Sequence, residues 1–217
     1  MVGFARPEQI GLAAEVSASF ALDNGAFSVW KQGLKPDWEG YMDWVHGWSY
    51  HPGFDWAIIP DSIDGNESEN DALIAKYASD HINVPVWHLH ESPERLGQLV
   101  NAWPRVALGS SGKYSDPGSS AWWARITEVA PILFDEHGRP VCKIHGLRMM
   151  NASIFSHIPF SSVDSTNIAR NHDRESERYG ISNEVAAQII NSRLEQHAAA
   201  ARWSGSAGVR ENMELFG

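Results

Sequence analysis

Short apolar runs alternate with helical patterns along almost the whole chain, and this alternation constrains the fold more than any other feature. Each run is bounded by Gly, Pro, Asp or Ser, as buried strands commonly are. The runs cover residues 18–23, 56–60, 84–88, 105–109, 141–145 and 160–164. The helical segments expected after them are 38–45, 73–77, 92–103, 122–133, 149–157 and 184–198. Six strand–helix units in series predict an α/β fold with a parallel sheet.

The length of the chain limits the form of this sheet. At 217 residues the chain is shorter than the roughly 250 residues of a complete TIM barrel, and six units are fewer than its eight. We therefore expect a TIM-barrel-like (β/α) barrel in a reduced or distorted form. It would be a single domain spanning residues 1–217, with the regular pattern running from about residue 7 to residue 203.

Charge is unevenly distributed between the two halves of the sequence. The formal net charge of −10 argues against a protein that coats nucleic acid nonspecifically. Residues 1–100 contain 5 Lys+Arg and 15 Asp+Glu, whereas residues 101–217 contain 12 of each. The second half therefore has enough basic residues for a local strip: Arg139, Lys143, Arg148, Arg170, Arg174 and Arg178. The alternative is a solvated surface of mixed charge, because Arg174 and Arg178 are close enough to Glu175 and Glu177 to pair with them on a helix.

Several classes of protein are disfavoured by composition. No apolar stretch reaches the roughly 18 residues of a membrane span, and the N-terminus lacks the pattern of a signal peptide, so we expect a cytoplasmic protein with no membrane partner. The one cysteine, Cys142, excludes an internal disulfide and a zinc site made of several cysteines. The sequence indicates no cofactor and no resident metal.

Polar residues follow each apolar run at the point where a strand would end. Carboxyl ends of parallel strands meet at one edge of a sheet, where α/β proteins commonly place their chemistry. Asp23 ends the first run and Asp164 ends the last, so we expect these two carboxylates to share one pocket. A single aspartate more often caps a helix or begins a turn. Several polar loops at one edge favour an active site.

Four short motifs in chain order resemble those of the tRNA-guanine transglycosylases. Asp23-Asn24-Gly25-Ala26-Phe27 is similar to the family's Asp-Ser-Gly-Gly-Phe motif, and residues 57–61 resemble its strand ending on a base-reading aspartate. Residues 106–110 resemble its glycine-rich base-contacting loop, and residues 163–166 with 169–171 resemble the segment that carries its nucleophilic aspartate. The matches span about residues 18 to 171.

Departures from the family pattern indicate which members of the family the chain resembles most. The family members that act on tRNA have a zinc site of three cysteines and one histidine, and this sequence has nothing comparable. Ala26 replaces a glycine of the first motif, and His88 and His90 stand near the position of a glutamine. The chain is most similar to the DNA-modifying 7-deazaguanine transglycosylases (DpdA-like proteins). The resemblance thus implies DNA rather than tRNA as the polymer and a free 7-deazaguanine of the preQ0 type as the incoming base.

The resemblance and the chemistry together assign roles to individual residues. Asp164 is the expected nucleophile, which would hold the sugar covalently, and Asp23 is the expected acid and base, with a pKa raised by a neighbouring negative charge. Asp61 would accept N–H groups of a guanine-like edge, and the Gly109 N–H would donate to its carbonyl. The expected substrate-binding residues are Asn24, Gly25, Phe27, Asp61, His88, His90, Gly109, Ser110 and Gly146. The expected nucleic-acid-binding residues are Lys113, Arg148, Arg170 and Arg174.

The same residues are compatible with other functions. His88-Leu89-His90 has the spacing with which a strand end presents two imidazoles to a metal, so a metal-dependent hydrolase using His145 and Asp164 as further ligands is one alternative. A transglycosylase-like subunit that binds nucleic acid without catalysis is another. Phe27 could stack on a base or belong to the core. Trp122-Trp123 could form the interface of a homo-oligomer.

Overall fold

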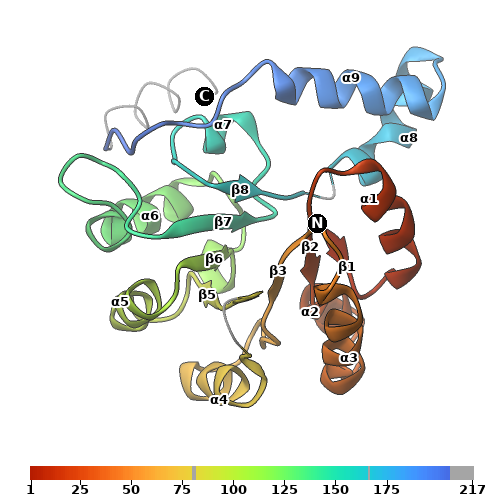
Figure 1. The fold of residues 1–217 in the computed structure, drawn as a ribbon. Helices are drawn as coiled ribbons and strands as arrows, with labels where there is room; N and C mark the ends of the chain where they lie inside the picture. Colours follow the sequence, from red (N-terminus) through yellow and green to blue (C-terminus); the bar gives the residue numbers. More distant parts are fainter. Residues whose placement is uncertain (80–81, 166, 206–217) are drawn as a thin grey trace. The chain divides into compact units, whose positions relative to one another are not determined.

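The structure, a computed structural model, describes residues 1–79, 82–165 and 167–205, with the side chains of all of these except 167–172. Strands and helices alternate along them, which confirms the α/β class (Figure 1). The strands are β1 (Val2–Gly3), β2 (Phe20–Asp23), β3 (Phe54–Ile58), β4 (Asn83–Val84), β5 (Val86–His88), β6 (Arg105–Gly109), β7 (Lys143–Leu147) and β8 (Ser162–Val163). The α-helices are α1 (Ile10–Val16), α2 (Ala26–Lys31), α3 (Trp38–Ser49), α4 (Glu67–Tyr77), α5 (Pro93–Ala102), α6 (Ser120–Leu133), α7 (Ala152–Phe155), α8 (Asn167–Tyr179) and α9 (Asn183–Glu195).

The strands form two sheets of four, in the orders β1-β2-β3-β4 and β5-β6-β7-β8. The pairs β1–β2, β2–β3, β3–β4 and β7–β8 are parallel. Only Pro85 separates β4 from β5, so one extended stretch pairs with β3 in its first half and with β6 in its second. Neither sheet closes on itself within the described residues, so a closed barrel is not observed.

Each of the six expected strands and six expected helices overlaps an observed element. The run 105–109 coincides with β6, and Ser92 caps α5 as expected, its side chain accepting the backbone N–H of Arg95. Of the strands and α-helices in the described residues, β1, α1 and α2 were not predicted, and α8 was anticipated only as a helix on which Arg174 and Arg178 could pair with Glu175 and Glu177. No helix in the described part of the chain has the length and apolarity needed to cross a membrane.

By its internal contacts the chain divides into two compact units, Met1–Ala107 and Leu108–Gly217. One core cluster of the first unit lies between β1, β2 and β3 on one side and helices α1 and α3 on the other. Its buried residues are Val2, Ile10, Phe20, Leu22, Tyr41, Val45 and Ala57. Burying these apolar side chains stabilises the first βα units and holds the carboxyl ends of β2 and β3 in register.

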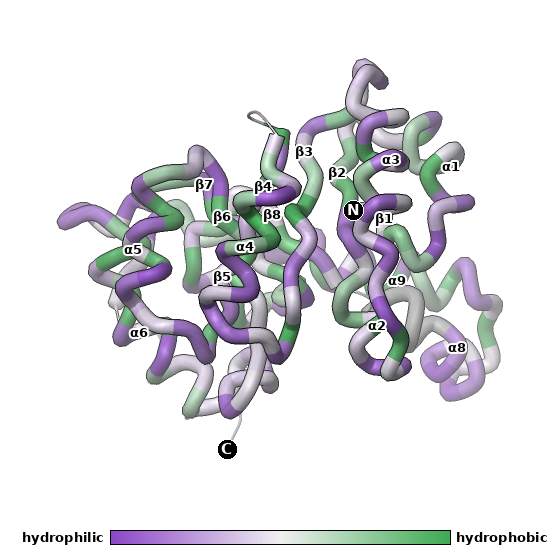
Figure 2. Tube along the Cα trace, turned by 90° about the horizontal axis from the view of Figure 1, so that it is seen from below, coloured by the Kyte–Doolittle hydropathy of each residue, from purple (hydrophilic) through white to green (hydrophobic). Residues whose placement is uncertain are grey.

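In the second unit, α6 is the most deeply buried helix. Trp122 and Ile126 on this helix are completely buried, and Trp123 is 7% exposed. The indole N–H of Trp122 donates to Ser110 Oγ at 3.0 Å, which satisfies its polar atom inside the core. The expectation that Trp122-Trp123 forms a surface interface patch is therefore wrong, because the apolar stripe of α6 is used for internal packing. In contrast, most of α8 is hydrophilic (Figure 2).

Gly25 has a conformational reason for being glycine. It precedes α2 with a φ of 73°, and a Cβ at this position would lie 3.2 Å from the backbone nitrogen of Ala5. An L side chain here would be strained by the left-handed backbone and also crowded by Ala5.

We expect Gly25→Ala to lower the free energy of unfolding by about 1–3 kcal/mol, measured by urea denaturation. Gly47→Ala is the matched control, because Gly47 lies inside α3 with no atom within 4 Å of the added Cβ. That control should be neutral or stabilising by up to about 1 kcal/mol. Equal stability of Gly25→Ala and wild type would contradict this explanation.

Candidate functional site

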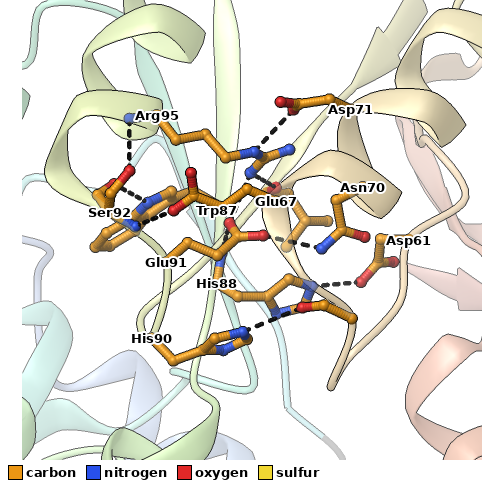
Figure 3. A network of polar contacts seen from close by, with 12 residues as sticks. Asp61, Glu67, Asn70, Asp71, Trp87, His88, His90, Glu91, Ser92 and Arg95 are labelled. Carbon is orange, nitrogen blue, oxygen red and sulfur yellow. Dashed lines mark hydrogen bonds and ion pairs between the residues drawn. The ribbon is translucent and has the colours of Figure 1, made fainter.

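Asp61 is the centre of the candidate site in the first unit. It follows β3, is 7% exposed, and accepts hydrogen bonds on both carboxylate oxygens. Asn24 Nδ2 donates to Oδ1 at 2.6 Å. His88 Nε2 lies 2.8 Å from Oδ2 (Figure 3). The segments that follow β2 and β3 and the last residue of β5 therefore meet at one carboxylate. Three of the expected substrate-binding residues, Asn24, Asp61 and His88, are brought together here.

Asn24 is held as rigidly as the carboxylate that it binds. Its Nδ2 also donates to the carbonyl of Ile59 at 2.8 Å, and its Oδ1 accepts the backbone N–H of Ala26 at 2.8 Å. The amide is buried, so these bonds fix the orientation of its N–H group. Asn24 thus binds the first backbone N–H of α2 and also positions Asp61.

A pocket of about 230 Å³ opens beside Asp61. Its lining combines aromatic and apolar side chains with carboxylates: Ala26, Val29, Trp30, Leu34, Pro36, Trp38, Asp61, Ser62, Ile63 and Asp64. The volume is below the roughly 300–1,000 Å³ of pockets for drug-sized ligands, which suits one small heterocycle. Trp30 is 47% exposed, so part of its indole is available to a ligand. A flat ring bearing N–H groups would find aromatic surface and a fixed acceptor there.

The aromatic residues of this pocket differ from the expected one. Phe27 is not among the lining residues; it packs against Trp30 with ring centroids 5.8 Å apart. Trp30 and Trp38 line the pocket instead. Trp30 was not predicted as a lining residue because no helix was expected over α2, and Trp38 was expected only as part of the helix 38–45. Gly25 likewise does not line the pocket, and its conformation explains its presence.

His88 and His90 do not converge in the manner of metal ligands. Their rings stack at 5.8 Å between centroids, and their Nε2 atoms have different partners, Asp61 and the carbonyl of Gly65. Across residues 1–79, 82–165 and 167–205, no group of three or more His, Cys, Asp or Glu side chains is arranged to hold a metal ion. His88 instead orients a carboxylate.

A buried ion pair supports the loop that carries His88 (Figure 3). Arg95 Nη1 donates to Glu91 Oε2 at 2.6 Å, and both residues are 2% exposed. Asn70 Nδ2 donates to the other Glu91 oxygen at 2.9 Å, and the His88 backbone N–H donates to Oε2 at 2.9 Å. The sequence signal was the spacing of Glu91 and Arg95, four residues apart across the cap of α5.

Helix α4 contributes a second anchor to the same loop. Glu67 accepts the backbone N–H of Ser92, and this hydrogen bond lowers the pKa of the Glu67 carboxyl. Asp71 accepts from Arg95 Nε at 2.9 Å. The carboxylates of α4 therefore hold the start of α5 while Arg95 connects the two helices.

Asp23 ends β2 and is half-buried. Burial raises the pKa of Tyr41 well above its ordinary value, and the charges of Asp23 and Asp61 raise it further. Tyr41 therefore stays protonated, and its hydroxyl donates to the carbonyl of Ile58 at 2.7 Å. β2 and β3 are parallel, so Asp23 at the end of β2 and Asp61 after β3 lie at the same end of the sheet.

Asp164 belongs to the second unit, at the end of β8. Its Oδ1 accepts the backbone N–H of Arg148 and lies 3.7 Å from His145 Nε2. His145 Nδ1 is 2.8 Å from Ser162 Oγ, and this hydrogen bond orients the imidazole. The side chain of Asp164 is 25% exposed, and Oδ2 has no hydrogen-bond partner among the described residues. Oδ1 is thus held by the backbone of Arg148.

Arg148 adopts a left-handed backbone conformation with a φ of 59°, which no other non-glycine residue of the described chain has. Its backbone N–H binds Asp164, and its Nη2 donates to the carbonyl of Ser110 at 3.3 Å. Such strain costs of order 1–3 kcal/mol and is kept where the surroundings require it, often at functional sites.

The remaining expected residues of the second unit have varied surroundings. Gly109 ends β6, and the Ser110 hydroxyl is engaged by Trp122. A Cβ on Gly146 would lie 3.0 Å from Met149 Cβ and Phe160 Cε1, so close packing explains this glycine. Lys113 is exposed beside the ring of Tyr114, and the side chain of Arg170 lies outside the described residues.

The expected pairing of Asp23 with Asp164 stays a prediction, since Asp23 belongs to the first unit and Asp164 to the second. No protein-family model, no curated protein and no solved structure matches the chain. The geometry of the side chains in each unit therefore carries the functional conclusion.

We expect Arg95→Met to lower the free energy of unfolding by about 3–5 kcal/mol, because it leaves the Glu91 carboxylate buried without its partner. The double variant Glu91→Gln/Arg95→Met should recover part of this loss. Both are measured by guanidinium denaturation. A loss below about 1 kcal/mol for Arg95→Met would show that the ion pair does not support the His88 loop.

Proposed function

We propose that the protein is a guanine transglycosylase that replaces guanine in DNA with a 7-deazaguanine base of the preQ0 type. The observation that carries the proposal is the buried Asp61 carboxylate at the wall of an aromatic pocket, fixed by Asn24 and His88. The four motifs that resemble those of the transglycosylases, in the same order along the chain, support the same activity.

Asp61 has the chemistry to select a guanine-type edge. A carboxylate has about four acceptor positions, and the two bonds from Asn24 and His88 leave capacity for two more. The ring N–H and exocyclic amino group of guanine, and of its 7-deaza analogues, form such a pair of donors. Adenine presents an acceptor where guanine has its ring N–H, so it would leave Asp61 partly unpaired.

In the proposed reaction, Asp164 attacks C1′ of the sugar and the bond from C1′ to N9 of guanine breaks. Asp23 donates the proton that the departing guanine requires. The incoming 7-deazaguanine then gives its N9 proton to Asp23, and its nitrogen displaces Asp164 from C1′. The fixed Oδ1 and unpartnered Oδ2 of Asp164 among the described residues suit this nucleophilic role.

The strand order is compatible with the barrel that such enzymes use. Read through Pro85, the strands follow one another in chain order from β1 to β8, as they do around a (β/α) barrel. We include a reduced (β/α) barrel in the proposal on this ground. DNA is preferred to tRNA because the sequence lacks the cysteines of the tRNA-acting members.

The direct test is base exchange. Purified protein is incubated with preQ0 and guanine-containing DNA, or with tRNA, and the digested nucleosides are analysed by mass spectrometry. We expect incorporation into DNA, and a loss of at least about 10³-fold with Asp164→Ala. Asp116→Ala, an aspartate in a turn of the same unit, is the control and should retain activity. Exchange in tRNA alone would overturn the choice of polymer, and exchange in neither polymer would overturn the proposed activity.

Base recognition by Asp61 has its own test. Asp61→Asn removes charge-assisted acceptors and should weaken the binding of preQ0 by about 10- to 100-fold. Binding is measured by the quenching of tryptophan fluorescence. Asp64→Asn removes the same charge from an exposed position on the same pocket and should bind within about threefold of wild type. Equal effects of the two substitutions would contradict a specific role for Asp61.

A further inference from the structure

A second pocket, of about 640 Å³, lies in the second unit and is rich in arginine. Its lining residues are Pro117, Arg148, Met150, Asn151, Ala152, Ile154, Ser165, Arg174, Glu175, Arg178, Ile190, Arg193, Leu194 and His197. Four arginines and one glutamate thus face one cavity in a protein of net charge −10. The apolar part of the lining suits an organic ligand that carries phosphate.

The positive charge of this pocket is only partly neutralised by the protein. Glu175 pairs with Arg193 across 3.7 Å, so one arginine is compensated. Arg174 forms no hydrogen bond or ion pair with any described residue. Arg178 lies over the ring of Tyr179 at 5.3 Å, which leaves its charge in place.

Helix geometry places Arg174 and Arg178 on one face of α8. They are four residues apart, a spacing at which like charges repel each other on a helix. An anion bound between them would remove this repulsion. Arginine suits phosphate in particular, because its planar guanidinium donates two parallel hydrogen bonds to phosphate oxygens.

The pocket lies directly beside Asp164. Ser165, the next residue, is part of the lining, and Arg148 joins the lining while its backbone N–H binds the Asp164 carboxylate. A ligand in the pocket would therefore be adjacent to the carboxylate proposed to attack the sugar. In a polynucleotide, the groups adjacent to a reacting sugar are its phosphodiesters.

We propose that the arginine pocket binds the phosphodiester backbone of the DNA strand next to the nucleotide that reacts at Asp164. This inference rests on the proposed function and assigns it a strand-binding site built from α8, α9 and the loop after β7. Arg174 and Arg178 provide charge, and Arg148 connects the bound strand to the position of Asp164. Backbone contacts of this kind position a strand without reading its sequence.

The test measures the binding of a fluorescently labelled single-stranded DNA by anisotropy. The salt concentration is varied from about 50 to 200 mM, a range over which phosphate contacts weaken steeply. Arg174→Gln/Arg178→Gln should bind at least about tenfold more weakly. The slope of log K against log[salt] should become shallower by about 1.4, because each phosphate contact on a single strand contributes about 0.7 to that slope. Arg139→Gln/Lys143→Gln is the matched control, because it removes two charges of the same unit from outside the pocket.

Each outcome decides for or against the pocket. Equal weakening by the control pair would show a general effect of charge and overturn the proposal. Arg174→Lys/Arg178→Lys preserves the charge and should bind between wild type and the glutamine pair, which separates lost charge from lost folding. Competition by dGMP or inorganic phosphate at the same concentration as the oligonucleotide would indicate a site for a free phosphate and overturn the strand assignment. Tighter binding of RNA of the same sequence would overturn the choice of DNA.

Failure of this proposal is distinguishable from failure of the proposed activity. If no base exchange is found but binding of DNA depends on Arg174 and Arg178, the activity is wrong and the pocket stands. If exchange occurs and its KM for DNA is unchanged in the glutamine pair, the pocket is wrong and the activity stands.

Discussion

A carboxylate that is removed from water needs hydrogen-bond partners within the protein. The partners of Asp61 determine how the segments around it in the first unit are arranged. An unpaired buried charge costs far more than a typical protein can spare from its total stability. Asn24 supplies one partner from the loop after β2, and His88 supplies the other from the end of β5. These two segments and the loop after β3 are therefore fixed to one another by a single electrostatic requirement, and the aromatic pocket lies beside the Asp61 that they hold.

The need to pair buried charges also applies to the residues that hold His88. Its backbone N–H binds Glu91, whose burial in turn requires Arg95 and Asn70. Networks of this kind rigidify a site when each member is satisfied, and they are costly when one member is lost. The site is consequently built on hydrogen bonds between loops, supported by the apolar packing of β2 and β3 against α3 beneath it.

The sequence was informative where a physical signal is strong and local. Alternating apolar runs revealed the α/β class, and the cap at Ser92 located the start of α5 because hydroxyl, proline and acid act together there. The two-residue strand β1 is too short to carry a pattern, and the mostly hydrophilic sequence of α8 indicated a helix only through the spacing of its charged residues. Of the candidate site, Asn24, Asp61 and His88 were predicted from strand ends. Trp30 and Trp38 were missed because contacts across the pocket depend on where α2 packs, which no local pattern encodes. Asp23 and Asp164 were expected to share a pocket from strand direction alone, an expectation that remains a prediction.

The left-handed conformation of Arg148 has a consequence for how this protein can vary. Glycine would adopt the same backbone without strain and would raise stability by about 1 kcal/mol, and asparagine would tolerate it almost as well. Either replacement would keep the backbone N–H that binds Asp164 and would lose the guanidinium that lines the neighbouring pocket. Stability and charge therefore favour different residues at this position. An arginine retained there in related sequences would indicate selection for function. A glycine or asparagine would indicate that the function of the guanidinium has been lost in that lineage.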